Sequence, residues 1–134
     1  MTEQPSSDTT SSKLEKLARE KCICIESYRK NGDGVRTPVW FVIDQGNLFV
    51  RTGRKTGKVK RIRGNSRVRI APCSFTGKVK GEWIDASASI GTEEEKQNAF
   101  VLLPKKYGLQ YRLTRFVQRL FGGKSDPLVL RITI

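Results

Sequence analysis

The chain has 134 residues, of which 37% are hydrophobic and 29% charged, and this composition is typical of a single soluble domain with one core. Its 26 Lys and Arg outnumber 13 Asp and Glu to give a net charge of +13, so we expect an anionic partner such as nucleic acid, a membrane surface, or a phosphorylated or polycarboxylate ligand. The absence of histidine excludes Ser-His-Asp triads, Cys-His dyads and histidine-ligated metals.

The N-terminal segment is not expected to be a signal peptide. Residues 1–12 are polar and rich in Ser and Thr, lack the charged and apolar regions of a signal peptide, and are predicted to form a disordered tail. Ser12 and Glu15 have capping-box spacing, which predicts a helix over 13–20. No apolar run approaches the roughly 20 residues that a membrane-spanning helix needs. We therefore expect a cytoplasmic protein without a membrane span.

Alternating segments dominate the next part of the chain. Three of them, at 21–29, 35–44 and 47–52, are separated by the turn sequences NGDG and QG and predict an antiparallel meander. Val59 and Ile62 then predict a short helix over 58–63. Two further strands are expected at 67–73 and 79–90.

Helices gather in the last third of the chain. Thr92 is placed to cap a helix that Pro104 should stop, a second helix is expected over about 108–121, and residues 127–134 predict a closing strand. The second helix combines apolar residues with arginines, so it could lie on a membrane surface or on nucleic acid, but packing on the barrel is favoured. Together these elements predict a mainly β fold, a small β-barrel with α additions, as one domain over 13–134.

Three cysteines are too few for a disulfide framework. Cys22 and Cys24 lie two residues apart in a predicted strand, so both point to the same face and are interpreted as small core residues. Zinc sites prefer four ligands, which this chain could not complete with histidine, so no metal site is predicted.

The most informative segment is the basic stretch, residues 45–81, with eleven Lys or Arg and no Asp or Glu. Apolar residues alternate with its charges, so the anion should bind to a folded surface. Within it, Gly53 and Gly57 permit unusual backbone angles, Thr56 can cap a helix, and Lys58 adds a cation. These features predict a phosphate cradle. A solvated basic loop is the alternative.

Two aromatic positions are candidates for contacts with a planar ligand. Pro38 interrupts an otherwise good strand, so Thr37–Trp40 should be an edge where a ligand pairs with the backbone; an edge strand with Trp40 in the core is the alternative. Trp83, near Lys80, could stack on a planar anion or belong to the core.

Five runs follow one another along the chain: RTPVWFVID, NLFVRTG, TGKVKRIRGN, RVRIAPC and GEW. In this order they resemble the flavin/deazaflavin oxidoreductases of the pyridoxamine 5′-phosphate oxidase-like split β-barrel class, most of all the branch that uses coenzyme F420. The resemblance covers roughly residues 14–134. Many relatives have Asn-Pro where this chain has Asn65-Ser66. The resemblance implies a split β-barrel homodimer with one cofactor in each of two clefts at the subunit interface.

The resemblance also implies site residues. The backbone of Thr37, Pro38, Val39 and Trp40 would contact the tricyclic ring. The phosphate would be held by Arg51, Thr52, Thr56 and Lys58, with Val59 and Lys60 nearby, and Lys80 and Trp83 would reach the cofactor of the other subunit.

The excess charge favours coenzyme F420 over the alternative, flavin mononucleotide (FMN), because F420 carries a phosphodiester, a carboxylate and a glutamate tail. The expected activity is hydride transfer between the bound cofactor and a small organic substrate, for which the sequence nominates no catalytic residue. Tyr107 and Tyr111 are unranked candidates for supplying a proton. Two other functions stay open: a cofactor carrier or storage protein without turnover, and a nucleic-acid-binding barrel.

Overall fold

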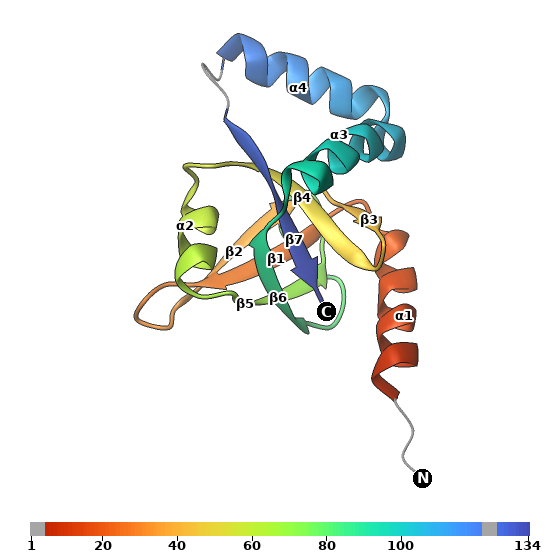
Figure 1. Cartoon of the computed structure of the whole chain (residues 1–134), viewed down its shortest axis with the longest axis vertical. Coiled ribbons are helices and arrows are strands. Elements are labelled where there is room, and N and C mark those ends of the chain that lie inside the picture. Colours follow the sequence, from red (N-terminus) through yellow and green to blue (C-terminus); the bar gives the residue numbers. More distant parts are fainter. Residues whose placement is uncertain (1–4, 122–125) are drawn as a thin grey trace.

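The structure is a computed structural model that describes residues 5–121 and 126–134. Figure 1 shows a strongly curved sheet with helices around its periphery. Its elements are α1 (Pro5–Ala18), β1 (Ile23–Tyr28), β2 (Gly34–Val39), β3 (Val42–Asp44), β4 (Asn47–Gly53), α2 (Gly57–Gly64), β5 (Arg67–Pro72), β6 (Ile84–Ile90), α3 (Glu93–Tyr107), α4 (Leu109–Phe121) and β7 (Pro127–Thr133). None of the helices in these ranges is long and apolar enough to cross a membrane.

The sheet has seven antiparallel strands in the order β2-β1-β5-β6-β7-β4-β3. Its two edge strands, β2 and β3, are consecutive in the chain and are separated only by residues 40 and 41. The sheet must therefore curl until its edges approach each other, which makes a barrel that stays open between β2 and β3. The prediction of a mainly β split barrel with α additions is confirmed.

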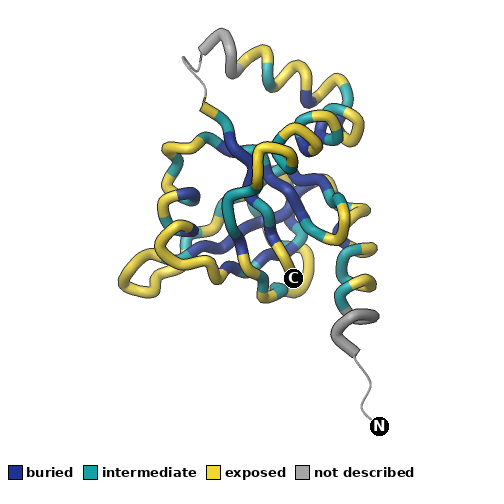
Figure 2. The backbone as a smooth tube through the Cα atoms, in the orientation of Figure 1, coloured by how far each residue is buried: buried dark blue, intermediate teal, exposed yellow. Residues whose placement is uncertain are grey.

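The barrel encloses the main core. Alternate residues of the strands point inward and are completely or almost completely buried, as in Ile23, Ile25, Val50 and Leu130. Burial of each such side chain stabilises the fold by about 1.5–3 kcal/mol. Figure 2 shows that buried residues are concentrated in the strands. The predicted core positions of Cys22 and Cys24 are confirmed, and both are buried with Cys73 in a small cluster beside Trp83.

The predicted strand over 35–44, and with it the simple meander, is wrong. The segment divides at Trp40 and Phe41 into β2, which pairs with β1, and β3, which pairs with β4. The reason lies far away in the chain: the backbone N–H and C=O of Phe41 are hydrogen-bonded by the Tyr107 hydroxyl at 3.0 Å, so they are not available to a strand. The predicted turn at 45–46 is confirmed, with φ of 51° at Gln45 and 82° at Gly46.

Two other boundaries differ from the prediction. Helix α1 begins at Pro5, so residues 5–12 are helical where a tail was expected; proline suits a first helical position because its missing N–H needs no partner there. Strand β6 begins at Ile84 instead of residue 79, because Val79 makes only an isolated antiparallel bridge to Cys73 and the chain then bends at Gly81.

Helix α3 starts as predicted, with a complete capping box between Thr92 and Glu95, but Pro104 does not stop it. The helix continues to Tyr107 and ends at Gly108, where φ is 62°. Ala99, Leu103 and Tyr107 recur every four residues and are buried on one face. This packing compensates for the backbone hydrogen bond that proline removes.

Candidate anion and cofactor site

The side chains of Thr52, Thr56 and Lys58, here called the Lys58 cluster, meet where β4 leads into α2. The Lys58 ammonium donates to the Thr52 hydroxyl at 2.8 Å, and the hydroxyls of Thr52 and Thr56 lie 3.4 Å apart. The sequence places these residues within seven positions, and the turn through Gly53 folds them together. The predicted meeting of lysine, hydroxyls and a helix start is therefore seen in the structure.

Thr56 occupies the N-cap position of α2, but its hydroxyl donates to the Gly53 carbonyl at 3.0 Å and does not cap the helix. The backbone N–H of Lys60 makes the bond to the Thr56 carbonyl. The N–H groups of Gly57, Lys58 and Val59 come before this first hydrogen bond of the helix, so they have no partner within it. In the described chain no side chain caps them. Free N–H groups at a helix start bind anions.

Lys58 is withdrawn from solvent without an acidic partner. Burial, assisted by the nearby guanidinium of Arg61, lowers the pKa of Lys58 below its usual value. Within the described residues, no carboxylate oxygen lies within 4.0 Å of its ammonium. A Cβ at Gly57 would lie 2.9 Å from an Arg61 guanidinium nitrogen, so the glycine lets Arg61 fold back over the first turn of α2. The result is a pair of cations for which the described chain supplies no carboxylate counter-ion.

The other predicted members of the phosphate region differ in what they can offer. Val59 is buried in the core, so only its backbone faces the site, and Lys60 is exposed. Arg51 lies over the Phe100 ring at 4.3 Å. Burial and the nearby Arg115 lower the pKa of Arg51, against an opposing effect of Tyr111. Helix α4 thus brings Arg115, which is not among the predicted site residues, near Arg51.

The segment Thr37–Trp40 lies on an edge strand, as predicted, because β2 pairs with β1 on one side only. Thr37 and Val39 lie opposite the core residues Ile25 and Ile23, whereas Pro38 is exposed. Trp40 stacks on Tyr107 with ring centroids 4.6 Å apart and planes 11° apart. The indole therefore packs within the protein, while the outer backbone edge of β2 has no strand beside it in the described chain.

Lys80 and Trp83 have partners of their own. The Lys80 ammonium pairs with Glu20 at 3.0 Å. Trp83 packs against the cysteine cluster, and the guanidiniums of Arg36 and Arg69 lie 4.7 and 4.8 Å from its ring centroid. In the described chain, neither residue is hydrogen-bonded or ion-paired to the Lys58 cluster.

Two residues beside Trp40 have altered pKa values. Burial raises the pKa of Tyr107 to about 12, and its hydroxyl is occupied by the backbone of Phe41 and by the Lys21 carbonyl at 2.8 Å. Burial lowers the pKa of Lys106 to about 8; its ammonium donates to the Phe41 carbonyl at 3.0 Å. The sequence did not single out Lys106, because a lysine in the last turn of a helix is ordinary.

The thiols are poor candidates for chemistry. Burial raises the pKa of Cys24, and burial together with Cys22 raises the pKa of Cys73 to about 12. Thiols with raised pKa values are weak nucleophiles at neutral pH. The described side chains therefore suggest binding and positioning, with reactivity supplied by a bound group.

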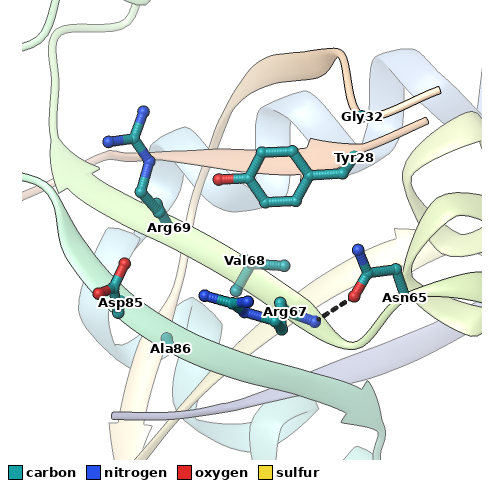
Figure 3. Close-up of a pocket in the computed structure, with 8 residues that line it drawn as sticks. All are labelled: Tyr28, Gly32, Asn65, Arg67, Val68, Arg69, Asp85 and Ala86. Carbon is teal, nitrogen blue, oxygen red and sulfur yellow. Dashed lines mark hydrogen bonds between the residues drawn. The ribbon is translucent and has the colours of Figure 1, made fainter. Parts of the chain in front are cut away.

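A separate pocket of about 270 Å³ lies on the outer side of the sheet, between β1, β5 and β6 (Figure 3). Its polar side chains are those of Tyr28, Asn65, Arg67, Arg69 and Asp85. None of the predicted site residues lines it. Its arginines belong to the basic stretch, but the pocket is not the predicted cofactor site.

No protein-family model matches the sequence, and no curated protein matches it. Solved structures do match. A candidate pyridoxamine 5′-phosphate oxidase from Listeria innocua is 17% identical, with a TM-score of 0.65 over 93% of this chain and 92% of that chain. An FAD-binding protein from Mesorhizobium loti is 14% identical, with a TM-score of 0.59 over 92% of this chain and 87% of the other.

The same fold also occurs in the haem storage protein HutZ from Vibrio cholerae, which is 16% identical with a TM-score of 0.56 over 99% of this chain and 90% of that one. At such identities the similarity shows the pyridoxamine 5′-phosphate oxidase-like split-barrel fold. The three names include an oxidase, a flavin-binding protein and a storage protein, so the fold by itself does not decide the activity.

Proposed function

We propose that this protein is an oxidoreductase that binds coenzyme F420, with FMN as the alternative, and transfers a hydride between the coenzyme and a small organic substrate. The observation that carries the proposal is the Lys58 cluster: a partly buried ammonium, two hydroxyls and free helical N–H groups, with no carboxylate near the ammonium in the described chain.

The cluster suits a phosphate group. Phosphate oxygens would accept hydrogen bonds from Lys58, from the two threonine hydroxyls and from the first N–H groups of α2. Each hydrogen bond to a charged group contributes about 1.5–3 kcal/mol when its geometry is fixed. Arg51 and Arg115 are placed to meet further negative charge beyond the phosphate. These additional cations favour the longer anionic tail of F420 over the single phosphate of FMN.

The outer edge of β2 would hold the ring. Backbone groups of Thr37–Trp40 are available there, and Tyr107 holds the end of this segment through Trp40 and Phe41. When bound, the coenzyme supplies the hydride-transfer chemistry, and the protein contributes orientation and the exclusion of water. The open side of the barrel would be covered by a second subunit, which is where Lys80 and Trp83 would reach the other coenzyme.

A storage role is the second candidate, because HutZ shares the fold. The chain contains no histidine, so a histidine-ligated haem is excluded. Storage of F420 without turnover is compatible with the same binding residues, and Tyr107 is occupied by backbone partners instead of being free to donate a proton. Turnover of an electron acceptor by the loaded protein distinguishes the two roles.

The binding test is a titration of purified protein with F420 and with FMN. Wild type should bind F420 more tightly than FMN. Lys58→Ala should weaken F420 binding at least about tenfold, which is ~1.4 kcal/mol. Arg63→Ala removes an equal charge from an exposed position on the same helix and should change affinity less than about twofold. The proposal fails if wild type binds neither coenzyme, and a steep loss of RNA binding with salt would favour the nucleic-acid-binding barrel instead.

A further inference from the structure

Helix α4 presents an apolar surface to solvent. Leu109, Leu113, Phe116 and Val117, here called the α4 stripe, are 79%, 59%, 57% and 45% exposed. Their spacing of four, three and one residues places them on one side of the helix. A single exposed apolar side chain needs no explanation, but a contiguous stripe marks an interaction surface. The predicted packing of this helix on the barrel is therefore wrong for these residues.

The opposite side of α4 faces the protein. Tyr111 is buried and lies against Trp40, with ring centroids 6.2 Å apart. At about 100° per residue, Tyr111 lies roughly 200° from Leu109 and Leu113. Figures 1 and 2 show α4 running along the outside of the molecule, joined to α3 and largely exposed. The stripe is thus directed away from the barrel.

The charge around the stripe is of one sign. Arg112 is exposed and lies beside Leu109 and Phe116 at the border of the stripe, whereas Arg115 is on the side of Tyr111 and Arg51. Residues 96–125 contain seven Lys or Arg and no Asp or Glu. An apolar face bordered by arginine is complementary to a surface that is apolar inside and negatively charged at its rim.

We infer that α4 binds the surface of a membrane that contains anionic lipids, lying parallel to it. The α4 stripe would enter the region between headgroups and acyl chains, and Arg112 would lie at the level of the lipid phosphates. A symmetric contact between two α4 helices is less well matched, because it would bring the basic segment of one copy against the same segment of the other, where no carboxylate could pair with the arginines. This inference does not depend on the proposed coenzyme.

The test is co-sedimentation of the full chain with vesicles. Two compositions are compared: phosphatidylcholine alone, and phosphatidylcholine mixed with phosphatidylglycerol. We expect binding to the mixed vesicles and at least about tenfold weaker binding to phosphatidylcholine alone. Phe116→Glu should reduce binding to the mixed vesicles at least about tenfold, and Arg112→Gln about fivefold. Leu113→Gln is a milder second variant that should act in the same direction.

Phe75→Glu is the matched control, because Phe75 is 54% exposed but lies outside α4. It should bind the mixed vesicles like wild type. Far-UV circular dichroism and the melting temperature show whether each variant is folded. The inference is overturned if wild type does not sediment with the mixed vesicles, or if Phe116→Glu binds them unchanged. It is also overturned if sedimentation velocity shows that Phe116→Glu separates a dimer that does not bind vesicles, because a second copy then covers the stripe.

Discussion

Glu26 is buried and Lys58 is partly buried, but within the described residues only the Glu26 carboxylate meets opposite charge. Glu26 accepts hydrogen bonds from Arg36 at 3.0 Å, from Arg69 at 2.8 Å and from Tyr28 at 2.8 Å. We call these four residues the Glu26 cluster. In the Lys58 cluster the ammonium meets only a hydroxyl, and within the described residues no carboxylate is close to it.

The pKa directions express the same contrast. Burial alone would raise the pKa of Glu26, but the hydrogen bonds from Arg36, Tyr28 and Arg69 outweigh it and lower the pKa. Burial lowers the pKa of Lys58, and no acidic group opposes it. A charge that is satisfied within the fold stabilises the fold, whereas a charge left without a counter-ion is suited to an external anion.

Removing the charge of Glu26 should have the largest effect on stability. Glu26→Gln leaves two arginines beside a neutral side chain, and we expect the free energy of unfolding to fall by about 3 kcal/mol, the lower end for a broken buried pair because both arginines are partly exposed. Urea denaturation measures it. Coenzyme affinity should not change, and a loss of affinity larger than the loss of stability would contradict the separation of the two clusters.

Comparing the unfolding free energies of wild type and Glu26→Gln over a range of pH tests how the charge of Glu26 stabilises the fold. Since the pKa of Glu26 is lower in the folded state than its ordinary value of 4.5, its stabilisation is complete at neutral pH and is lost as the pH falls through the folded pKa. The difference in unfolding free energy between wild type and Glu26→Gln should therefore narrow in acid. A difference in unfolding free energy that stays the same at all pH values would show that the shape of the Glu26 side chain, and not its charge, stabilises the fold.

Crowding the Glu26 cluster should have the next largest effect. A Cβ at Gly34 would lie 2.9 Å from both Cγ and Cδ of Glu26, so Gly34→Ala should displace the carboxylate from its arginines. We expect a loss of about 2 kcal/mol in the free energy of unfolding. Gly64→Ala is the control, because no atom lies within 4 Å of its added Cβ. Equal stability of the two variants would contradict the prediction.

The Lys58 cluster predicts a pH-dependent affinity. Only the charged ammonium attracts a phosphate, and the pKa of Lys58 is lowered, so its charge is lost at a lower pH than the ordinary 10.5. Wild type should lose about tenfold in F420 affinity as the pH rises from neutral toward 10.5, whereas Lys58→Arg should keep its charge and lose much less. Parallel pH profiles for the two proteins would contradict the assignment.

The smallest expected effect is at Thr52. Thr52→Val keeps the shape of a buried side chain but removes the hydroxyl that accepts from Lys58 at 2.8 Å. We expect F420 affinity to fall about fivefold, or ~1 kcal/mol. Thr76→Val removes an exposed hydroxyl and should leave the affinity unchanged. Equal affinities in the two variants would remove Thr52 from the site.

Features that depend on a few neighbouring residues were predictable from sequence. The Gln45-Gly46 turn, the Thr92 capping box and helix α2 are decided by local backbone preferences and by hydrogen bonds between residues close in the chain. The Lys58 cluster belongs with them, since its three members lie within seven positions. The mainly β character follows likewise from the alternation of apolar residues along the strands.

Features that depend on distant contacts were decided only by the tertiary structure. The break at Trp40 and Phe41 needs Tyr107, the continuation of α3 past Pro104 needs the buried face that contains Leu103 and Tyr107, and the Glu26 cluster needs Arg69 from another strand. The exposure of the α4 stripe is of the same kind, because a periodic pattern shows that a helix has an apolar side but not what covers it. The physical reason is that free energies of packing and ion pairing depend on which residues meet in space, and sequence spacing specifies that only for near neighbours.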